Sequence, residues 1–497
     1  MNSVSVKDIC ESTKGSLLYN EAFFSRETAE GLIVDSVIID SRQGAENTLF
    51  VPFIGERHDA HDFIPDVYRL GTRVCFTSRN RMETGTDEMV YICVEDTLEA
   101  LQRLGTAFRK RYRGKVIGIT GSVGKTTTKE MVALAMSEKA KVLKTFGNRN
   151  GQIGVPLMML ELDDSYDVAV IEMGMSLPGE MKKLAQIALP DMAVMTNIGV
   201  AHIGQLGSQE NILKEKLNIC SCFAKDGGVL LVNGEDEWLN RVEEYLPDKH
   251  QIKVVRFGLS ERADYYADAI QRFERHTEFM FCEKAGDDKV SVNLAALGMH
   301  NVIDAVSALA VAKEAGKDVA SAEKQLATYE PMASRGRLEQ VGELMLIDDT
   351  YNASPDSMRS GLDTVESLKA NGRKIVVLAD ILELGELSET CHREVGAYAA
   401  GKMIDCLITI GTEARFIAEQ AERVFNEAGV TTGNSVGNNS QKKSRMQICT
   451  CESREEAFSL WLSDLQAGDV VYMKGSHGMR LDLLAQQLRE KYSGSQQ

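Results

Sequence analysis

The stretch GITGSVGKTTTKEM, residues 118–131, decides the fold of the central part of this 497-residue chain. The apolar run KVIGIT ends inside it and a helical pattern follows, so its glycines mark a turn from strand to helix. Glycines let backbone N–H groups approach phosphate oxygens, and the helix that begins there adds its positive N-terminal end. The stretch therefore predicts a phosphate-binding loop. An ordinary glycine-rich turn is the alternative.

The spacing of this loop differs from that of a standard phosphate loop. The standard loop has four residues between its outer glycine and the Gly-Lys pair. Here the outer position is Ile119, and the nearest glycine is Gly121. In either spacing Lys125 is expected to neutralise the β- and γ-phosphates, and the Thr126 hydroxyl is expected to bind Mg²⁺.

Apolar strands alternate with helical segments after the loop, which predicts parallel sheets buried on both faces. The pattern first gives YDVAVIEMG, MAVMTNIG and GGVLLVN, and it restarts with LMLIDD, KIVVLAD, CLITIG and DVVYMKG. At about 100–200 residues per domain, the length fits three domains. We expect a small mixed α/β domain at 1–112, a central P-loop-type parallel-sheet ATP-binding domain at 113–332, and a C-terminal Rossmann-like domain at 333–497. The polar stretch 431–447 is predicted to be a surface loop.

Composition excludes several classes of function. A net charge of −17 argues against binding to nucleic acid or to an anionic membrane, both of which need a basic face. No apolar run approaches about 18 residues, so no membrane span is predicted. The N-terminus lacks a signal-peptide pattern, and the ten cysteines are scattered without a CxxC pair. We therefore expect a cytoplasmic protein with reduced thiols.

Polar residues follow the central strands at the edge where parallel sheets bind ligands. Glu172 ends the second strand, and Asn197 and His202 follow the third. Each has a structural alternative, but together with Thr126 they predict one Mg²⁺–phosphate site. Lys214 and Lys216 come next in a helical segment, and the residue pattern alone predicts that both are surface lysines.

The last third of the chain repeats this arrangement. Asp348 and Asp349 follow one predicted strand, and Lys474 and Ser476 follow another. A third strand is followed by Asp380, Glu383 and His392. Capping and turn formation would account for about half of these residues.

With these residues in hand, the chain resembles the Mur ligase family along nearly its full length. Thr120 to Thr126 match the short family loop Thr-Gly-x-x-Gly-Lys-Thr/Ser. Further support comes from TFGNRNGQIGVPLMML, DDTYNASPDSM, LADILELG and KGSHGMR. Within the family, these stretches are most similar to the members that add D-alanyl-D-alanine to UDP-N-acetylmuramoyl-tripeptide. The resemblance implies an ATP-dependent amide ligase of cell-wall precursor assembly that forms an acyl phosphate, uses two Mg²⁺ ions and acts as a monomer.

The resemblance also implies roles for individual residues. Lys216 is similar to the lysine that the family carbamylates with CO₂, which makes it a metal ligand rather than a surface residue. Metal ligation is implied for Thr126, Glu172, His202 and carbamylated Lys216, and a catalytic role for Lys125, Lys216, His202, Lys474 and Ser476. ATP binding is implied for Gly121, Ser122, Val123, Gly124, Lys125, Thr126, Thr127, Asn301, Arg337, Asp349 and Tyr351. Binding of the other substrates is implied for Ser41, Arg42, Asn148, Asn352 and Asp380.

Two other functions remain open at this point. One is another amide ligase of the Mur or folyl-polyglutamate type. The other is a P-loop small-molecule kinase, which would transfer phosphate to a stable product and form no amide.

Overall fold

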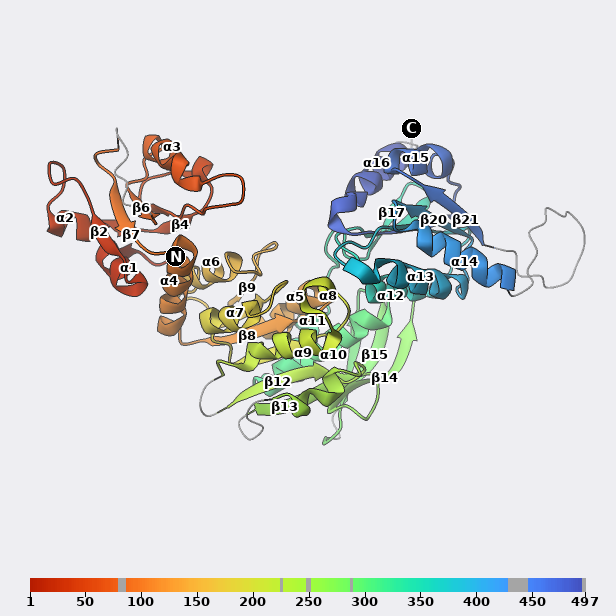
Figure 1. Ribbon diagram of the computed structural model, residues 1–497. Helices are drawn as coiled ribbons and strands as arrows, with labels where there is room; N and C mark the ends of the chain where they lie inside the picture. Colours follow the sequence, from red (N-terminus) through yellow and green to blue (C-terminus); the bar gives the residue numbers. More distant parts are fainter. Residues whose placement is uncertain (79–85, 224–226, 247–251, 287–288, 428–445, 494–497) are drawn as a thin grey trace, which may run out of the picture.

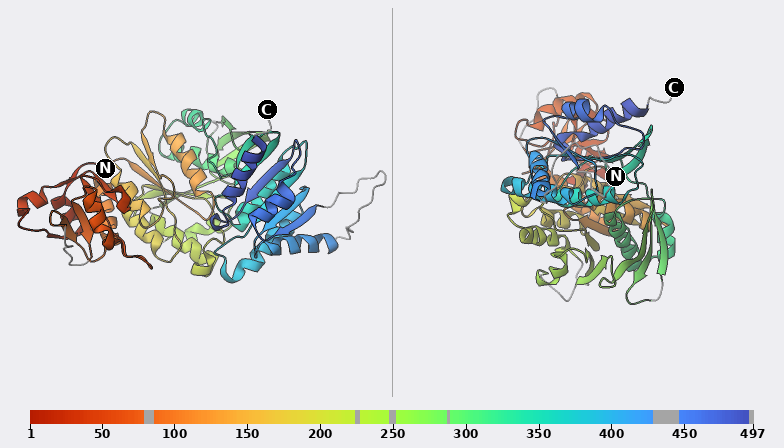
Figure 2. Two further views of the ribbon diagram at one scale, coloured as in Figure 1. Left: turned by 90° about the horizontal axis from the view of Figure 1, so that it is seen from above. Right: turned by 90° about the vertical axis from the view of Figure 1, so that its right-hand side faces the viewer.

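The fold was examined in a computed structural model, which describes residues 1–78, 86–223, 227–246, 252–286, 289–427 and 446–493. Three sheets follow one another along the chain. In Figure 1 the N-terminal part lies at one end, the central part in the middle and the C-terminal part at the other end. The view from above in Figure 2 shows the same linear order. The molecule is therefore elongated.

The N-terminal sheet is small and mixed. Its strands lie in the order β2 (Ser16–Leu18), β7 (Val90–Cys93), β6 (Val74–Thr77), β5 (Thr48–Phe50) and β4 (Ser36–Ile38). β4 to β7 run parallel, and β2 is antiparallel to β7. A two-stranded sheet, β1 (Val4–Ser5) and β3 (Ile33–Val34), shares a hydrophobic cluster with helices α1 (Val6–Thr13) and α2 (Arg26–Glu30). Helix α3 (Ile64–Arg69) packs in a separate cluster.

Helix α4 (Thr97–Arg111) joins this part to the central one. It begins at Asp96, whose carboxylate accepts from the Glu99 N–H at 2.8 Å. Its Gly105 lies against Pro156 of α6 (Gly154–Leu160), where an added Cβ would be 2.9 Å from the proline backbone. The glycine thus allows the two helices to pack closely.

The central sheet has nine strands, with β8 (Lys115–Thr120) between β10 (Val168–Glu172) and β11 (Met192–Met195). The full order is β16 (Lys289–Leu294), β15 (Thr277–Glu283), β14 (Tyr265–Arg272), β13 (Ile252–Gly258), β12 (Gly228–Asn233), β11, β8, β10 and β9 (Val142–Lys144). β9 to β14 are parallel, but β15 and β16 are antiparallel additions. The four residues between β14 and β15 are too few for a crossover, so they can only make a hairpin.

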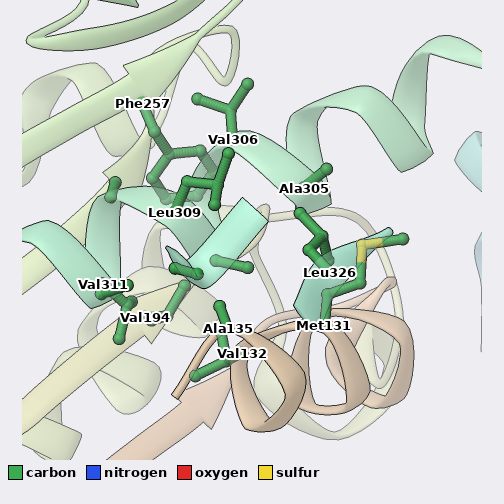
Figure 3. Packing of buried hydrophobic residues seen from close by; sticks show 14 of the residues in the cluster. Met131, Val132, Ala135, Val194, Phe257, Ala305, Val306, Leu309, Val311 and Leu326 are labelled. Carbon is green, nitrogen blue, oxygen red and sulfur yellow. The ribbon is translucent and has the colours of Figure 1, made fainter. Parts of the chain in front are cut away.

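Helices cover both faces of the central sheet. One face carries α5 (Lys125–Met136), α10 (Met299–Glu314) and α11 (Val319–Leu326), and the other carries α6, α7 (Glu180–Ala188) and α9 (Gln209–Leu217). Figure 3 shows Met131 and Val132 of α5 near Leu309 of α10 and Leu326 of α11. Side chains of β8 alternate between the two cores, as the strand period requires.

The C-terminal sheet has the order β17 (Arg337–Val341), β18 (Leu344–Asp349), β22 (Val470–Lys474), β19 (Lys374–Ala379), β20 (Cys406–Ile410) and β21 (Gln447–Cys451). β17 is antiparallel and the others are parallel. Its helices are α12 (Pro355–Ser367), α13 (Ser388–Ala400), α14 (Arg415–Glu427), α15 (Arg454–Ala457) and α16 (Leu481–Ser493).

The predicted α/β class with parallel sheets is confirmed. The first of the three larger sheets ends before residue 112, the second lies between residues 112 and 332, and the third begins after residue 332. The exact domain boundaries at these two residues stay a prediction. Most of the predicted loop at 431–447 lies outside the described residues, while Gln447 begins β21. In the part of the chain that is described, no helix is long and apolar enough to cross a membrane.

Leu309 offers a test of the central core, because α10 buries it fully between α5 and the sheet. Leu309→Ala should lower the free energy of unfolding by about 2–5 kcal/mol, since it removes apolar contacts and leaves a cavity. Urea denaturation measures the change. Leu177→Ala is the control, because half of that side chain is exposed, and an equal loss in both variants would contradict the packing described.

Candidate active site

A cavity of about 650 Å³ lies between the central and C-terminal sheets, at the carboxyl ends of their strands. Loops from both parts of the chain line it. Its lining includes Ser122, Val123, Gly124, Lys125, Thr126, Thr127, Asn148, Glu172, His202, Asn301, Asp349, Tyr351, Asn352, Lys474 and Ser476 among the residues singled out from the sequence. Most of those residues, from positions more than 350 apart in the chain, thus meet in one place.

The loop between β8 and α5 needs glycine at two positions. Gly121 has φ +151°, and a Cβ there would lie 1.8 Å from the Thr196 hydroxyl oxygen. Gly124 has φ +85° and precedes the first residue of α5. The Asn197 side-chain oxygen accepts from the N–H groups of Ser122 at 3.1 Å and Val123 at 2.9 Å. The neighbouring strand end therefore holds the loop in shape.

Two lysines converge behind this loop. Lys125 Nζ donates to the carbonyl oxygens of Gly121 at 2.8 Å and Ser122 at 3.2 Å. Lys216 Nζ donates to the same Gly121 carbonyl at 3.0 Å. Burial lowers the pKa of Lys125, and it lowers the pKa of Lys216 well below its ordinary value, with the Lys125 charge acting in the same direction. This environment favours a neutral, nucleophilic Lys216 amine.

The prediction of a surface position is wrong for Lys216, which is 2 % exposed. The reason lies in α9, where the fully buried Ile212 and Leu213 are four and three residues earlier and put Lys216 on the inner face. The prediction is confirmed for Lys214, whose side chain is 51 % exposed and pairs with Glu210. The apolar period of the helix carried the signal.

Glu172 lies 3 % exposed at the end of β10. Its carboxylate accepts from the Thr126 hydroxyl at 3.0 Å and from the Asn150 side-chain amide at 2.8 Å. The described residues contain no cluster of three or more His, Cys, Asp or Glu fit for a metal. A hydroxyl and one carboxylate nevertheless suit Mg²⁺, which takes one or two carboxylates and completes its shell with substrate phosphates and water. Thr126 and Glu172 thus fit a magnesium–nucleotide site.

His202 comes after β11 in a left-handed conformation, φ +62°. Its Nδ1 atom lies 3.0 Å from a carboxylate oxygen of Glu383, which belongs to the loop after β19. Burial lowers the pKa of His202, the nearby Glu383 carboxylate opposes that effect, and the charges of Lys216 and Lys125 add to it. A largely neutral imidazole is suited to metal binding.

The C-terminal side of the cavity presents a second ion pair. Lys474 Nζ lies 2.6 Å from the Asp349 carboxylate, which also accepts from the Tyr472 hydroxyl at 3.1 Å. Ser476 accepts from the Leu382 N–H at 2.9 Å. Tyr351 is stacked by the Arg335 guanidinium, 3.7 Å from the ring centre. Asp349 and Tyr351 thus line the same cavity as the loop between β8 and α5.

Several predicted residues lie elsewhere. Lys216 and Gly121 lie just behind the cavity wall, and Arg337 is exposed on β17 outside it. Asp380 points away, because its carboxylate accepts from the N–H groups of Glu413 and Ala414. His392 is fully buried and accepts from the Ile381 N–H, so its role is structural. Ser41 and Arg42 lie in the N-terminal part, where Arg42 pairs with Asp40 at the surface.

Among the cavity residues that the sequence did not predict, Arg335 and Asn150 contact the predicted metal ligands directly. Arg335 donates to the Thr126 hydroxyl at 3.2 Å, and Asn150 holds Glu172. Asn150 stands two residues after Asn148 in a polar, glycine-flanked stretch, which was a usable signal. Nothing in SRGR distinguishes Arg335 from Arg337 until the start of β17 is known.

Known proteins are similar to this chain in both sequence and fold. Residues 119–312 match the family model described as Mur ligase middle domain, and residues 336–477 match the one described as Mur ligase, glutamate ligase domain. The UDP-N-acetylmuramoyl-tripeptide--D-alanyl-D-alanine ligase of Bacillus subtilis is 34% identical over 98% of both chains. This chain belongs to the Mur ligase family. The resemblance stated from the sequence is therefore confirmed.

Other Mur ligases agree in sequence and structure. The Escherichia coli protein with the same printed name is 31% identical over 78% of this chain and 83% of its own. A crystal structure of MurF from Acinetobacter baumannii superposes with a TM-score of 0.85, at 27% identity over 99% of this chain and 100% of the other. The MurF ligase of Thermotoga maritima, solved in complex with ADP, gives 0.77 at 26% identity over 92% and 97%.

Gly121→Ala tests the phosphate loop of this Mur ligase. The added methyl group would collide with Thr196 in a backbone conformation that favours glycine, so the loop must shift. Strain of about 1–3 kcal/mol should weaken ATP binding by roughly 5- to 150-fold, measured by calorimetry. Gly401→Ala is the control, because Gly401 has the ordinary helical φ of −78° at the end of α13. Unchanged affinity in Gly121→Ala would contradict the loop geometry.

Proposed function

We propose that this Mur ligase joins D-alanyl-D-alanine to UDP-N-acetylmuramoyl-tripeptide with ATP, the last cytoplasmic step in assembling the peptidoglycan precursor peptide. The observation that carries the proposal is the 34% identity, over 98% of both chains, to the Bacillus subtilis ligase of that name. The cavity between the two sheets supports the proposal, because its lining joins the phosphate loop to residues of the C-terminal part that could bind another substrate.

The reaction must activate a carboxylate before an amine can attack it. The tripeptide carboxylate attacks the γ-phosphate of ATP, which gives an acyl phosphate and ADP. The amine then attacks the acyl carbon, the bond from that carbon to the phosphate oxygen breaks, and the nitrogen gives up a proton as phosphate leaves. Two anions meet in the first step, so catalysis rests on positioning and on charge neutralisation. Lys125 and the N-terminal end of α5 supply positive charge where that step occurs.

Bound magnesium would supply further positive charge to offset the two anions in this step. Thr126 and Glu172 are the residues that fit a first ion. For a second ion we propose Glu172, His202 and Lys216 as ligands, with Lys216 carbamylated. Burial lowers the pKa of its amine well below the ordinary value, which favours the neutral form that reacts with CO₂, and the carbamate would carry a negative charge instead of a positive one.

The remaining assignments complete the proposal. Ser41 and Arg42 bind the UDP end of the substrate, and Asn148 and Asn352 contact the peptide or amine substrate. Asn301, Asp349 and Tyr351 bind the nucleotide, while Lys474 and Ser476 approach the acyl phosphate from the C-terminal side. Arg335 lies in the cavity where Arg337 had been expected to bind ATP, and Asp380 supports the cavity wall. We propose a monomer in the cytoplasm.

Release of phosphate tests the reaction class. Purified protein with ATP, Mg²⁺ and UDP-N-acetylmuramoyl-tripeptide should release phosphate continuously only when D-alanyl-D-alanine is added, because the amine completes the cycle. Coupled phosphate detection and mass spectrometry of the product measure this. A stable phosphorylated product would indicate a kinase. Ligation of a glutamate in place of the dipeptide would indicate a folyl-polyglutamate-type enzyme.

Lys216→Ala tests the proposed carbamate. The variant should lose at least about 100-fold in kcat, as expected when a group that orients or binds a catalytic metal is removed. Formate or acetate should restore part of the activity by supplying the missing negative charge. Lys214→Ala, on the exposed face of the same helix, is the control and should match the wild type. Full activity in Lys216→Ala would remove this residue from the site.

A further inference from the structure

The amine substrate brings a charge that the cavity must accommodate. An α-amino group has a pKa near 7.7–8.0, so at pH 7 it arrives mostly as an ammonium ion. Lys125, Arg335 and Lys474 place positive charge in the cavity, which suits phosphates and repels an ammonium ion. A carboxylate that is not already neutralised is therefore needed where the amine enters. Six carboxylates line the cavity: Glu172, Glu180, Asp304, Asp349, Asp356 and Glu383.

Three of these carboxylates are engaged on the central side. Glu172 holds Thr126 and Asn150, as described above. Glu180 accepts from two backbone N–H groups, those of Ser176 at 2.7 Å and Leu177 at 3.0 Å. Asp304 is buried behind the phosphate loop, accepts from Thr128, and has its pKa raised to about 7 by burial. Each of these three carboxylates thus already accepts hydrogen bonds from protein groups.

Two more are engaged on the C-terminal side. Asp349 is neutralised by Lys474 at 2.6 Å. Asp356 lies in the first turn of α12, 3.5 Å from Arg359, and packs against Gly199, where an added Cβ would be 2.5 Å from its carboxylate. Burial raises its pKa, and its carboxylate already lies beside the Arg359 guanidinium.

Glu383 differs from all five. Its side chain is 63 % exposed although it lines the cavity. Among the described residues, the side-chain contact recorded for its carboxylate is the one with His202 Nδ1 at 3.0 Å. The loop holds it in a left-handed conformation, φ +65°, between β19 and the 3₁₀ turn Gly385–Leu387. This backbone directs an exposed carboxylate across the domain boundary.

The position of Glu383 is close to the place of the reaction. His202, its neighbour, is near enough to Lys125 and Lys216 for their charges to act on it. Both lysines bind the carbonyl of Gly121 in the phosphate loop. The Glu383 carboxylate therefore reaches from the C-terminal side of the cavity to His202, a residue of the central side near the phosphate loop.

We propose that Glu383 binds the ammonium group of the amine substrate and holds it beside the place of the acyl phosphate, where the nitrogen loses one proton to solvent and then attacks as the free amine. The inference rests on the proposed ligase function and adds a specificity residue to it. It explains why the carboxylate is exposed, because a substrate ion replaces water there. It also predicts selection for a free amine over a blocked one, since an N-acylated dipeptide carries no positive charge.

Glu383→Gln tests the proposal, because it keeps the shape and removes the charge. With ATP and the UDP-tripeptide saturating, the KM for D-alanyl-D-alanine should rise roughly 10- to 100-fold, as for loss of a hydrogen bond to a charged group. Formation of the acyl phosphate should be unchanged when it is trapped with hydroxylamine, which carries no charge at neutral pH. Glu383→Asp keeps the charge and should retain a KM within a few-fold of the wild type.

Glu386→Gln is the matched control, because Glu386 is an exposed carboxylate three residues away that does not line the cavity. An unchanged dipeptide KM in Glu383→Gln would overturn the proposal. So would an equal loss of hydroxamate formation, because Glu383 would then act through His202 on phosphoryl transfer. If the wild type itself forms no amide with the dipeptide, it is the proposed function that fails instead.

Discussion

The contact between Gly121 and Thr196 fixes the geometry on which the site depends. β8 lies between β10 and β11, so the loop that follows it is flanked by the ends of both neighbours. On one side Thr196 packs against the loop and Asn197 accepts hydrogen bonds from it. On the other side the Glu172 carboxylate accepts from the Thr126 hydroxyl. Because strand order sets these distances, a short loop can be held without an outer glycine at Ile119.

Charge is distributed unevenly across the cavity. Lys125 and Lys216 share one carbonyl group, and both have their pKa lowered by burial. Such a pair is unfavourable unless something anionic joins it. A phosphate provides that at Lys125, and a carbamate would provide it at Lys216. The opposite arrangement holds at Glu383, where a carboxylate is exposed without a basic residue other than His202 recorded beside it in the described part of the chain.

The sequence predicted the parallel sheets and the strand-end residues well, because strand and helix periods and the position of the loop are local features. It failed where distant segments decide. The burial of Lys216 depends on which face of α9 packs inward. The orientation of Asp380 depends on backbone N–H groups 33 residues later in the chain. Arg335 and Arg337 differ by two positions, and the start of β17 sends one into the cavity and the other to the surface. The hairpin of β14 and β15 was not predicted, because neither of these two strands was recognised in the sequence.

The polar contacts recorded between the central and C-terminal sides of the site are individually weak. Glu383 reaches His202, and Arg335 reaches Thr126, both from partly exposed positions. Partly exposed polar contacts of this kind contribute about 0–1.5 kcal/mol each. Separating these groups breaks few polar contacts, and the apolar contacts that would also be lost are those of Val200 and Leu297 with the C-terminal core. This enzyme must admit three substrates and release three products at one site. Weak polar contacts across that site allow its two sides to separate for each exchange.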